Sequence, residues 1–182
     1  MKKEEYAIIV DYLPHGYPLE GKMMPIAQAI GESVLVLLEL VPRKGLTFEL
    51  GERVYIGEGK REKIYYILGR LKKEKITETA KEQLQTFIEK IVKEREKEFV
   101  EFFNKSESIN KRIHQIGLLP GMGKKYMQEI LKERNLKEFE SFEDIKKRIS
   151  NLPFPEKAIE KRIFQELVGE ERHNLFTQQT RY

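Results

Sequence analysis

Residues 118–125 read Leu-Leu-Pro-Gly-Met-Gly-Lys-Lys, and apolar residues recur at helical spacing on both sides of this stretch. Proline followed by glycine interrupts a helical pattern, so the stretch predicts a tight turn between two helices. Glycine has no side chain and lets another molecule come close to the backbone. Lys124 and Lys125 place positive charge at the start of the second helix, where unpaired N–H groups attract anions. We therefore expect this turn to contact phosphate groups.

Four short helices are expected between residue 106 and Gly169, with the turn separating the first two. Ser141 with Asp144 predicts a capped start for the third helix. The tail from residue 170 to 182 has little periodicity, and it either folds back through Leu175 and Phe176 or stays mobile. The apolar residues that mark the helices are Ile109, Ile113 and Ile116; Tyr126, Met127, Ile130 and Leu131; Phe142, Ile145 and Ile149; and Ala158, Ile159, Ile163 and Leu167.

A weak internal repeat relates these helices. A shift of 33 residues places Ile116 on Ile149, Leu119 on Leu152, Pro120 on Pro153, Lys124 on Lys157 and Ile130 on Ile163. Two such helix-turn-helix units can bury their apolar faces against each other. The second copy has Phe154 and Glu156 in place of the two glycines, and bulk and negative charge there would hinder a phosphate. We infer that the second turn is structural and the first makes the contact.

The region before residue 78 has the pattern of short strands separated by Gly and Pro turns. Strands are expected at 6–13, 33–41, 53–56 and 63–71, whereas 26–30 fits a helical turn or a strand equally well. Eight of the twelve glycines precede residue 70, which supports a change of structural class after it. A small five-stranded barrel of the OB type is the economical expectation.

Residues 79–103 predict one long helix, begun by a capping box of Thr79 and Glu82. The expected fold class is therefore α+β. The expected domains are an OB-like barrel over 1–78, a connecting helix over 79–104, and a nucleic-acid-binding tandem of helix-turn-helix units over 105–182.

Aromatic residues of the expected barrel could stack on nucleic-acid bases, or they could simply pack the barrel and its edges. No motif selects any one of them. The candidate contacts on the barrel are Arg53, Tyr55 and Tyr66. The full set of aromatic candidates is Tyr12, Tyr17, Phe48, Tyr55, Tyr65 and Tyr66.

The composition excludes several classes of protein. Charged residues make up 35% of the chain and hydrophobic residues 40%, which suits a globular protein. No run approaches the roughly 20 apolar residues of a membrane span, and the first residues lack the apolar run of a secretory signal. Cysteine is absent, which excludes disulfides and thiolate zinc sites. We expect a cytoplasmic protein that needs no cofactor and no membrane.

Positive charge is concentrated around the turn. Residues 1–103 contain 18 basic and 18 acidic side chains, and residues 151–182 contain five of each. Residues 104–150 contain 11 basic and seven acidic ones, which is the whole surplus of four. This surplus of positive charge is either ordinary surface variation or a sign that the segment binds an anionic partner.

The turn resembles the hairpin of the helix-hairpin-helix superfamily, which reads hydrophobic-x-Pro-Gly-hydrophobic-Gly. Residues 119–123 match it, and residues 106–168 are similar to the tandem unit of the Holliday-junction branch-migration protein and of many repair enzymes. The resemblance implies that hairpin amides contact phosphates of one strand without reading sequence. Some superfamily members also hold a monovalent cation on hairpin carbonyls.

The whole chain resembles a mainly archaeal, uncharacterised family of nucleic-acid-binding proteins, domain of unknown function family 655, with a barrel followed by the tandem unit. The likeness rests on residues 51–57 (Gly-Glu-Arg-Val-Tyr-Ile-Gly), 101–104 (Glu-Phe-Phe-Asn) and 112–115 (Arg-Ile-His-Gln). The implied contact residues are Leu119, Gly121, Met122, Gly123, Lys124, Lys125 and Arg112.

Three functions remain open on this sequence. The first is a non-enzymatic nucleic-acid-binding protein of loose specificity, with RNA slightly favoured over DNA. The second is an enzyme such as a nuclease, although His15, His114 and His173 are far apart and neither Asp11 nor Asp144 has a carboxylate partner. The third is a protein-interaction adaptor that uses the aromatic residues of 99–103.

Overall fold

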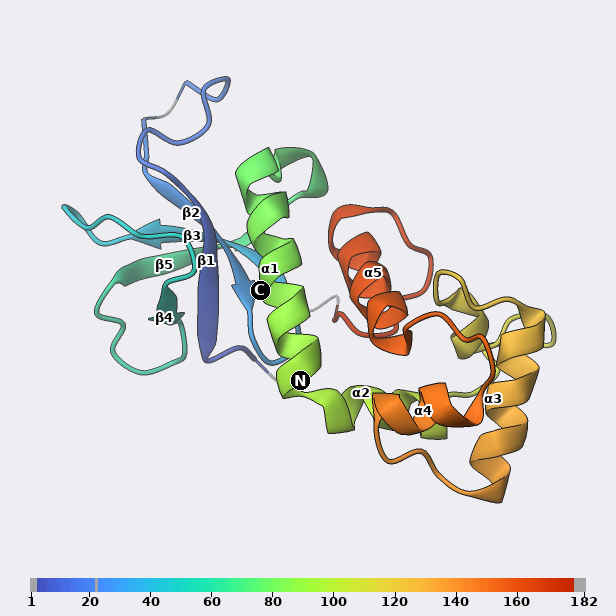
Figure 1. The fold of residues 1–182 in the computed structure, drawn as a ribbon. Helices are drawn as coiled ribbons and strands as arrows, with labels where there is room; N and C mark the ends of the chain where they lie inside the picture. Colours follow the sequence, from blue (N-terminus) through green and yellow to red (C-terminus); the bar gives the residue numbers. More distant parts are fainter. Residues whose placement is uncertain (1–2, 22, 179–182) are drawn as a thin grey trace. The chain divides into compact units, whose positions relative to one another are not determined.

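The computed structural model describes residues 3–21 and 23–178 of this α+β protein (Figure 1). The chain begins with five strands and continues with helices, as expected. The strands are β1 (Tyr6–Leu13), β2 (Ile26–Gly31), β3 (Leu37–Pro42), β4 (Arg53–Tyr55) and β5 (Ile64–Arg70). The α-helices are α1 (Glu78–Glu94), α2 (Glu96–Lys105), α3 (Lys124–Leu136), α4 (Phe142–Arg148) and α5 (Pro155–Val168), and the 3₁₀ turns are η1 (Lys73–Lys75) and η2 (Gln115–Leu118).

The five strands form one antiparallel sheet in the order β4-β1-β2-β3-β5 (Figure 1). The sheet curls into a half-barrel whose edges are β4 and β5. Every residue of β2 and β3 is buried. A strand buried on both faces has no polar alternation, which explains why periodicity left residues 26–30 undecided.

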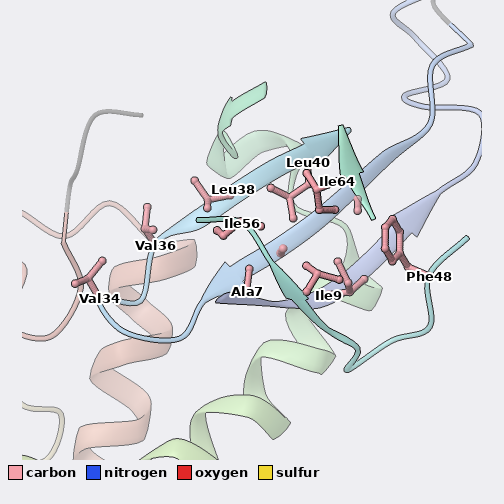
Figure 2. Close-up of a cluster of buried hydrophobic side chains, with 12 residues drawn as sticks. Ala7, Ile9, Val34, Val36, Leu38, Leu40, Phe48, Ile56 and Ile64 are labelled. Carbon is pink, nitrogen blue, oxygen red and sulfur yellow. The ribbon is translucent and has the colours of Figure 1, made fainter. Parts of the chain in front are cut away.

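The concave side of the sheet encloses the core of this part of the protein. Figure 2 shows side chains from β1, β3 and β5, and from the loops beside them, that pack together and exclude water. The cluster comprises Ala7, Ile9, Ala27, Ala29, Val34, Val36, Leu38, Leu40, Phe48, Val54, Ile56 and Ile64. The expected strand at 33–41 begins only at Leu37, because Leu35 adopts a left-handed turn conformation with φ of 55°.

The expected single helix over 79–103 is wrong, because the chain bends at Arg95 between α1 and α2. Arg95 has φ of −104° and ψ of 30°. Residues 93–98 are all charged, so no apolar contact holds the helix straight there. The expected cap at Thr79 is also wrong. Thr77 caps α1, since its Oγ1 accepts a hydrogen bond of 3.1 Å from the Ala80 amide.

The expected helix over 106–116 is likewise wrong. Ser108 and His114 pair as an isolated antiparallel bridge, and the loop between them is closed by hydrogen bonds from Ile109 and Asn110 to the Ile113 carbonyl. The Asn110 side chain accepts from the amides of Arg112 and Ile113. Such Asx turns compete with helix formation. Only η2 remains helical before the Pro-Gly turn.

The last three helices match their predictions. The Ser141 Oγ accepts from the Asp144 amide at 3.0 Å and caps α4. After α5 the tail folds back: the buried Glu166 carboxylate accepts from the amides of Leu175, Phe176 and Thr177. The Gln178 amide then donates to the Val34 carbonyl.

The chain forms two compact units. One contains the described residues within Met1–Phe87 and Glu166–Tyr182, and the other is Ile88–Gln165. The first holds the sheet and the second holds the Pro-Gly turn. No helix in the described part of the chain is both long and apolar enough to cross a membrane.

Candidate nucleic-acid interface

The Pro-Gly stretch forms the tight turn that its sequence predicts. The Met122 amide donates to the Leu119 carbonyl at 3.1 Å, and Gly121 has φ of +77°. A type II turn favours proline at its second position and requires positive φ at its third. Pro120 and Gly121 supply these two properties, so the local sequence determines the backbone of the turn.

Buried side chains anchor this turn. Ile116, Leu119 and Met122 have exposed fractions of 0, 2 and 4%. The buried Arg162 guanidinium donates to the Leu118 carbonyl at 3.2 Å. Leu119 and Met122 were expected to contact nucleic acid. Because their side chains are buried, only their backbone atoms can make that contact. The anchoring by Arg162 could not be read from the sequence, since no local pattern links residues 118 and 162.

The start of α3 presents exposed backbone and positive charge. Gly121, Gly123, Lys124 and Lys125 are all exposed. Within the described chain, the amides of these residues have no protein acceptor, and Gly123 caps α3 without a side-chain hydrogen bond. Neither lysine forms an ion pair with another described residue. Free amides at a helix start, together with cationic side chains, form an environment suited to an anion.

Gly123 is a glycine that the fold does not require. Its φ of −69° is accessible to any residue, and a Cβ built on it would meet nothing within 4 Å. Glycine at this position leaves that space empty. Close approach by another molecule is a physical reason for glycine at this position.

Arg112 lies on the loop that precedes η2 and is exposed. The His114 side chain joins this loop to η2, because its Nδ1 accepts from the Ile116 amide at 3.1 Å. Burial, together with the nearby Arg134 charge, lowers the pKa of His114. His114 therefore acts as a neutral acceptor in a rigid loop, and Arg112 is presented a few residues before the turn.

The second turn of the repeat differs in the way its sequence suggests. Phe154 is 61% exposed and occupies the position equivalent to Gly121. Lys157, the counterpart of Lys124, is paired with Glu160 at 2.9 Å and with Glu89 at 3.6 Å. Pro155 opens α5, and its ring fills a buried position. This turn therefore has no glycine, and its lysine is paired with carboxylates.

The candidates on the sheet are less available than expected. The Arg53 guanidinium binds Glu32 through contacts of 2.6 to 3.1 Å and lies 3.5 Å from the centre of the Tyr6 ring. The Tyr55 hydroxyl accepts from the Gly59 amide, and its ring lies against Gly57 and Gly59. Tyr66 is 37% exposed and contacts Tyr65 edge to face. All three residues thus have structural partners, because the Tyr66 hydroxyl donates to the Met24 Sδ at 3.8 Å, and the Tyr66 side chain is partly exposed.

The two aspartates considered for catalysis both have hydrogen-bond partners in the fold. The Asp11 carboxylate accepts from the Thr77 hydroxyl at 2.5 Å, and Asp144 accepts from Arg148 and the Glu140 amide. Among residues 3–21 and 23–178, no three His, Cys, Asp or Glu side chains are grouped to hold a metal ion. The Leu118 and Leu119 carbonyls each accept one hydrogen bond, and a monovalent cation at the hairpin carbonyls stays a prediction.

Known proteins with similar sequences cover almost the whole chain. The chain is 43% identical over 175 residues to the uncharacterized protein MJ0038 of Methanocaldococcus jannaschii. The aligned region spans 96% of this chain and 79% of the relative. The chain is also 43% identical to Af1531 of Archaeoglobus fulgidus. That crystal structure superposes with a TM-score of 0.82 and covers 96% of this chain and 100% of the other. The family model of DUF655, described as a protein of unknown function, matches residues 3–178, and the chain belongs to this family.

Proposed function

We propose that this protein binds nucleic acid through the turn at 119–125, without enzymatic activity and largely without regard to sequence. Phosphate oxygens would accept from the amides of Gly121, Gly123 and Lys124, and the side chains of Lys124 and Lys125 would supply the counter-charge. Arg112 would add charge from the preceding loop. RNA is slightly favoured over DNA, because the sheet could hold a single strand.

The contrast between the two turns of the repeat supports this proposal most directly. Both turns are held by buried isoleucines at equivalent positions, namely Ile116 and Ile149 before the turn and Ile130 and Ile163 after it. A purely structural repeat would need no further difference. Only the first turn combines exposed glycines with lysines that pair with no other described residue. This difference is explained if the first turn contacts an anionic partner.

The finer descriptions of the fold belong to the same proposal. We infer that α3 with η2, and α5 with α4, are the two halves of a helix-hairpin-helix tandem, on the basis of their 33-residue spacing and shared apolar positions. We also infer an OB-like use of the curled sheet, in which its exposed residues hold a single strand.

The adaptor alternative has a smaller candidate surface than the sequence suggests. Phe99 and Phe103 on α2 have exposed fractions of 3 and 0%, whereas Phe102 is half-buried, so only Phe102 of these aromatic side chains is partly open to a partner. No feature of the described residues favours this alternative over the nucleic-acid proposal.

The test is a salt titration of binding by the variant Lys124→Glu/Lys125→Glu. A 20-nucleotide single-stranded RNA and a duplex of the same length would be titrated by fluorescence anisotropy at several salt concentrations. Each phosphate contact contributes about 0.7 to 0.9 to the slope of log K against log salt. We expect weaker binding and a slope that is lower in magnitude by about one to two units.

The matched control is Lys147→Glu/Lys161→Glu, which makes the same change in net charge at two exposed lysines on α4 and α5. This control should shift affinity less than the turn variant does and should leave the slope nearly unchanged. Equal effects of the two variants would show that only net charge matters, and unchanged binding by the turn variant would refute the proposal.

A further inference from the structure

A shallow groove on the first compact unit has the features of a second binding site. Its volume is about 530 Å³, within the range of ligand-binding clefts. It lies between the ends of β1, β3 and β5 and the loops beside them. Its lining residues are Tyr12, Pro25, Pro42, Arg43, Lys44, Gly45, Leu46, Thr47 and Tyr65.

An irregularity in the sheet directs Tyr65 outward. Val41 pairs with Tyr66 and Pro42 pairs with Ile64, so Tyr65 is the extra residue of a β-bulge. Proline has no N–H and cannot continue the ladder, which accounts for the bulge at Pro42. Ile64 and Ile67 both pack on the core, and the two tyrosines between them are left facing away from it. Bulges commonly aim a side chain at a functional site.

The aromatic rings at the groove are held in place and accessible. Tyr65 is 64% exposed, and its ring meets Tyr66 edge to face at 5.4 Å between centroids. Tyr12 contacts Phe48 edge to face at 5.7 Å, and its hydroxyl donates to the Leu46 carbonyl at 3.3 Å. A flat apolar molecule could lie against Tyr65 without displacing an existing partner from its face.

The charge at the groove selects an anionic occupant. Arg43 and Lys44 are exposed at its rim, and none of the described residues that line it is acidic. The Arg43 Nε donates to the Arg61 carbonyl, which holds this guanidinium at the rim. An apolar aromatic floor with a basic rim matches an unpaired nucleobase with its phosphate. A neutral peptide would leave the rim charges without a partner, and an acidic peptide would offer no flat base to stack on Tyr65.

We propose that this groove binds an unpaired base of a single-stranded nucleic acid, stacked on Tyr65, with its phosphate on Lys44 and Arg43. This inference takes only the class of ligand, nucleic acid, from the proposed function. None of the residues of the groove belongs to the turn at 119–125. It also replaces Arg53 and Tyr55 as the contact surface of the sheet.

The absence of tryptophan from the natural sequence allows a direct test. In the full chain carrying Tyr65→Trp, the new indole is the only one, and a stacked base quenches its fluorescence. We expect saturable quenching by a 12-nucleotide oligouridylate and little quenching by a duplex, whose bases are already stacked. Phe154→Trp is the matched control, because Phe154 is exposed to a similar extent at the second turn. Equal quenching in both variants would overturn the proposal.

Binding measurements complete the test. Tyr65→Ala should weaken oligouridylate binding by about fivefold or more and leave duplex binding nearly unchanged, whereas Tyr65→Phe should retain wild-type affinity. Quenching that persists in Lys124→Glu/Lys125→Glu would support the groove even if the turn makes no contact. If the turn variant loses binding but the fluorescence of Tyr65→Trp is not quenched, the groove proposal is wrong and the proposed function still stands. If uridine monophosphate quenches the fluorescence as strongly as the oligonucleotide does, the groove does not bind a strand.

Discussion

At the scale of single residues, the two glycines of the turn have different physical roles. Gly121 has φ of +77°, in the left-handed region that costs a side-chain-bearing residue about 1–2 kcal/mol. Gly123 has ordinary angles and open space around it. The sequence motif treats both glycines alike, and only the backbone geometry shows that Gly121 needs its left-handed conformation whereas Gly123 does not.

We predict that substitutions separate these two roles. Gly121→Val should lower the free energy of unfolding by about 1–2 kcal/mol, because a β-branched residue at positive φ strains the turn. Gly123→Ala should lower the free energy of unfolding by only about 0.5 kcal/mol, because an N-cap prefers glycine to alanine, yet weaken nucleic-acid binding by filling space at the start of α3. Urea denaturation and anisotropy measure the two effects. A stability loss in Gly123→Ala as large as that in Gly121→Val would contradict this division.

At the scale of secondary-structure elements, α1 shows how a side chain at the right distance defines a helix start. Thr77 accepts from the Ala80 amide, and its hydroxyl donates to Asp11 on β1. Its amide donates to the buried Gln28 on β2 at 3.2 Å. Thr79, two residues later, lies inside the helix and is exposed. The start of α1 is therefore fixed by contacts with the sheet.

We predict that Thr77→Val lowers the free energy of unfolding by about 1–2 kcal/mol, the usual consequence of losing an N-cap. Thr79→Val makes the same chemical change at a position that does not cap the helix, and it should alter the free energy of unfolding by no more than about 0.5 kcal/mol. Chemical denaturation of the two variants side by side gives the comparison. Similar losses in both would mean that threonine, rather than its place in the cap, matters for stability.

The same elements show what the sequence could predict. The turn at 119–122, the cap at Ser141 and the helices α3 to α5 follow from local chemistry, and each was predicted from it. The bend at Arg95, the cap at Thr77 and the loop at 108–114 depend on competing local bonds or on residues distant in sequence. The groove at Tyr65 depends on a bulge opposite Pro42, which a strand pattern cannot reveal.

At the scale of the whole molecule, the two compact units each contain one proposed contact surface. The turn at 119–125 belongs to Ile88–Gln165, and the groove at Tyr65 belongs to the unit that contains the sheet. A strand too short to reach both surfaces binds them as alternatives, so the stronger one dominates. A longer strand that reaches both gains effective concentration for the second contact.

We therefore predict that strand length changes how the two variants behave. The two variants are Tyr65→Ala and Lys124→Glu/Lys125→Glu. On single strands of about 4–6 nucleotides, the variant that alters the weaker surface should bind nearly as tightly as the wild type, because most of the short strand is bound at the stronger surface. On strands of about 30 nucleotides, both variants should weaken binding, because both surfaces hold the same strand. Anisotropy across a ladder of lengths locates the transition, which marks the shortest strand that spans the two sites. If one variant stays silent at every length, the two surfaces do not share a strand, and the proposed function then belongs to the other surface alone.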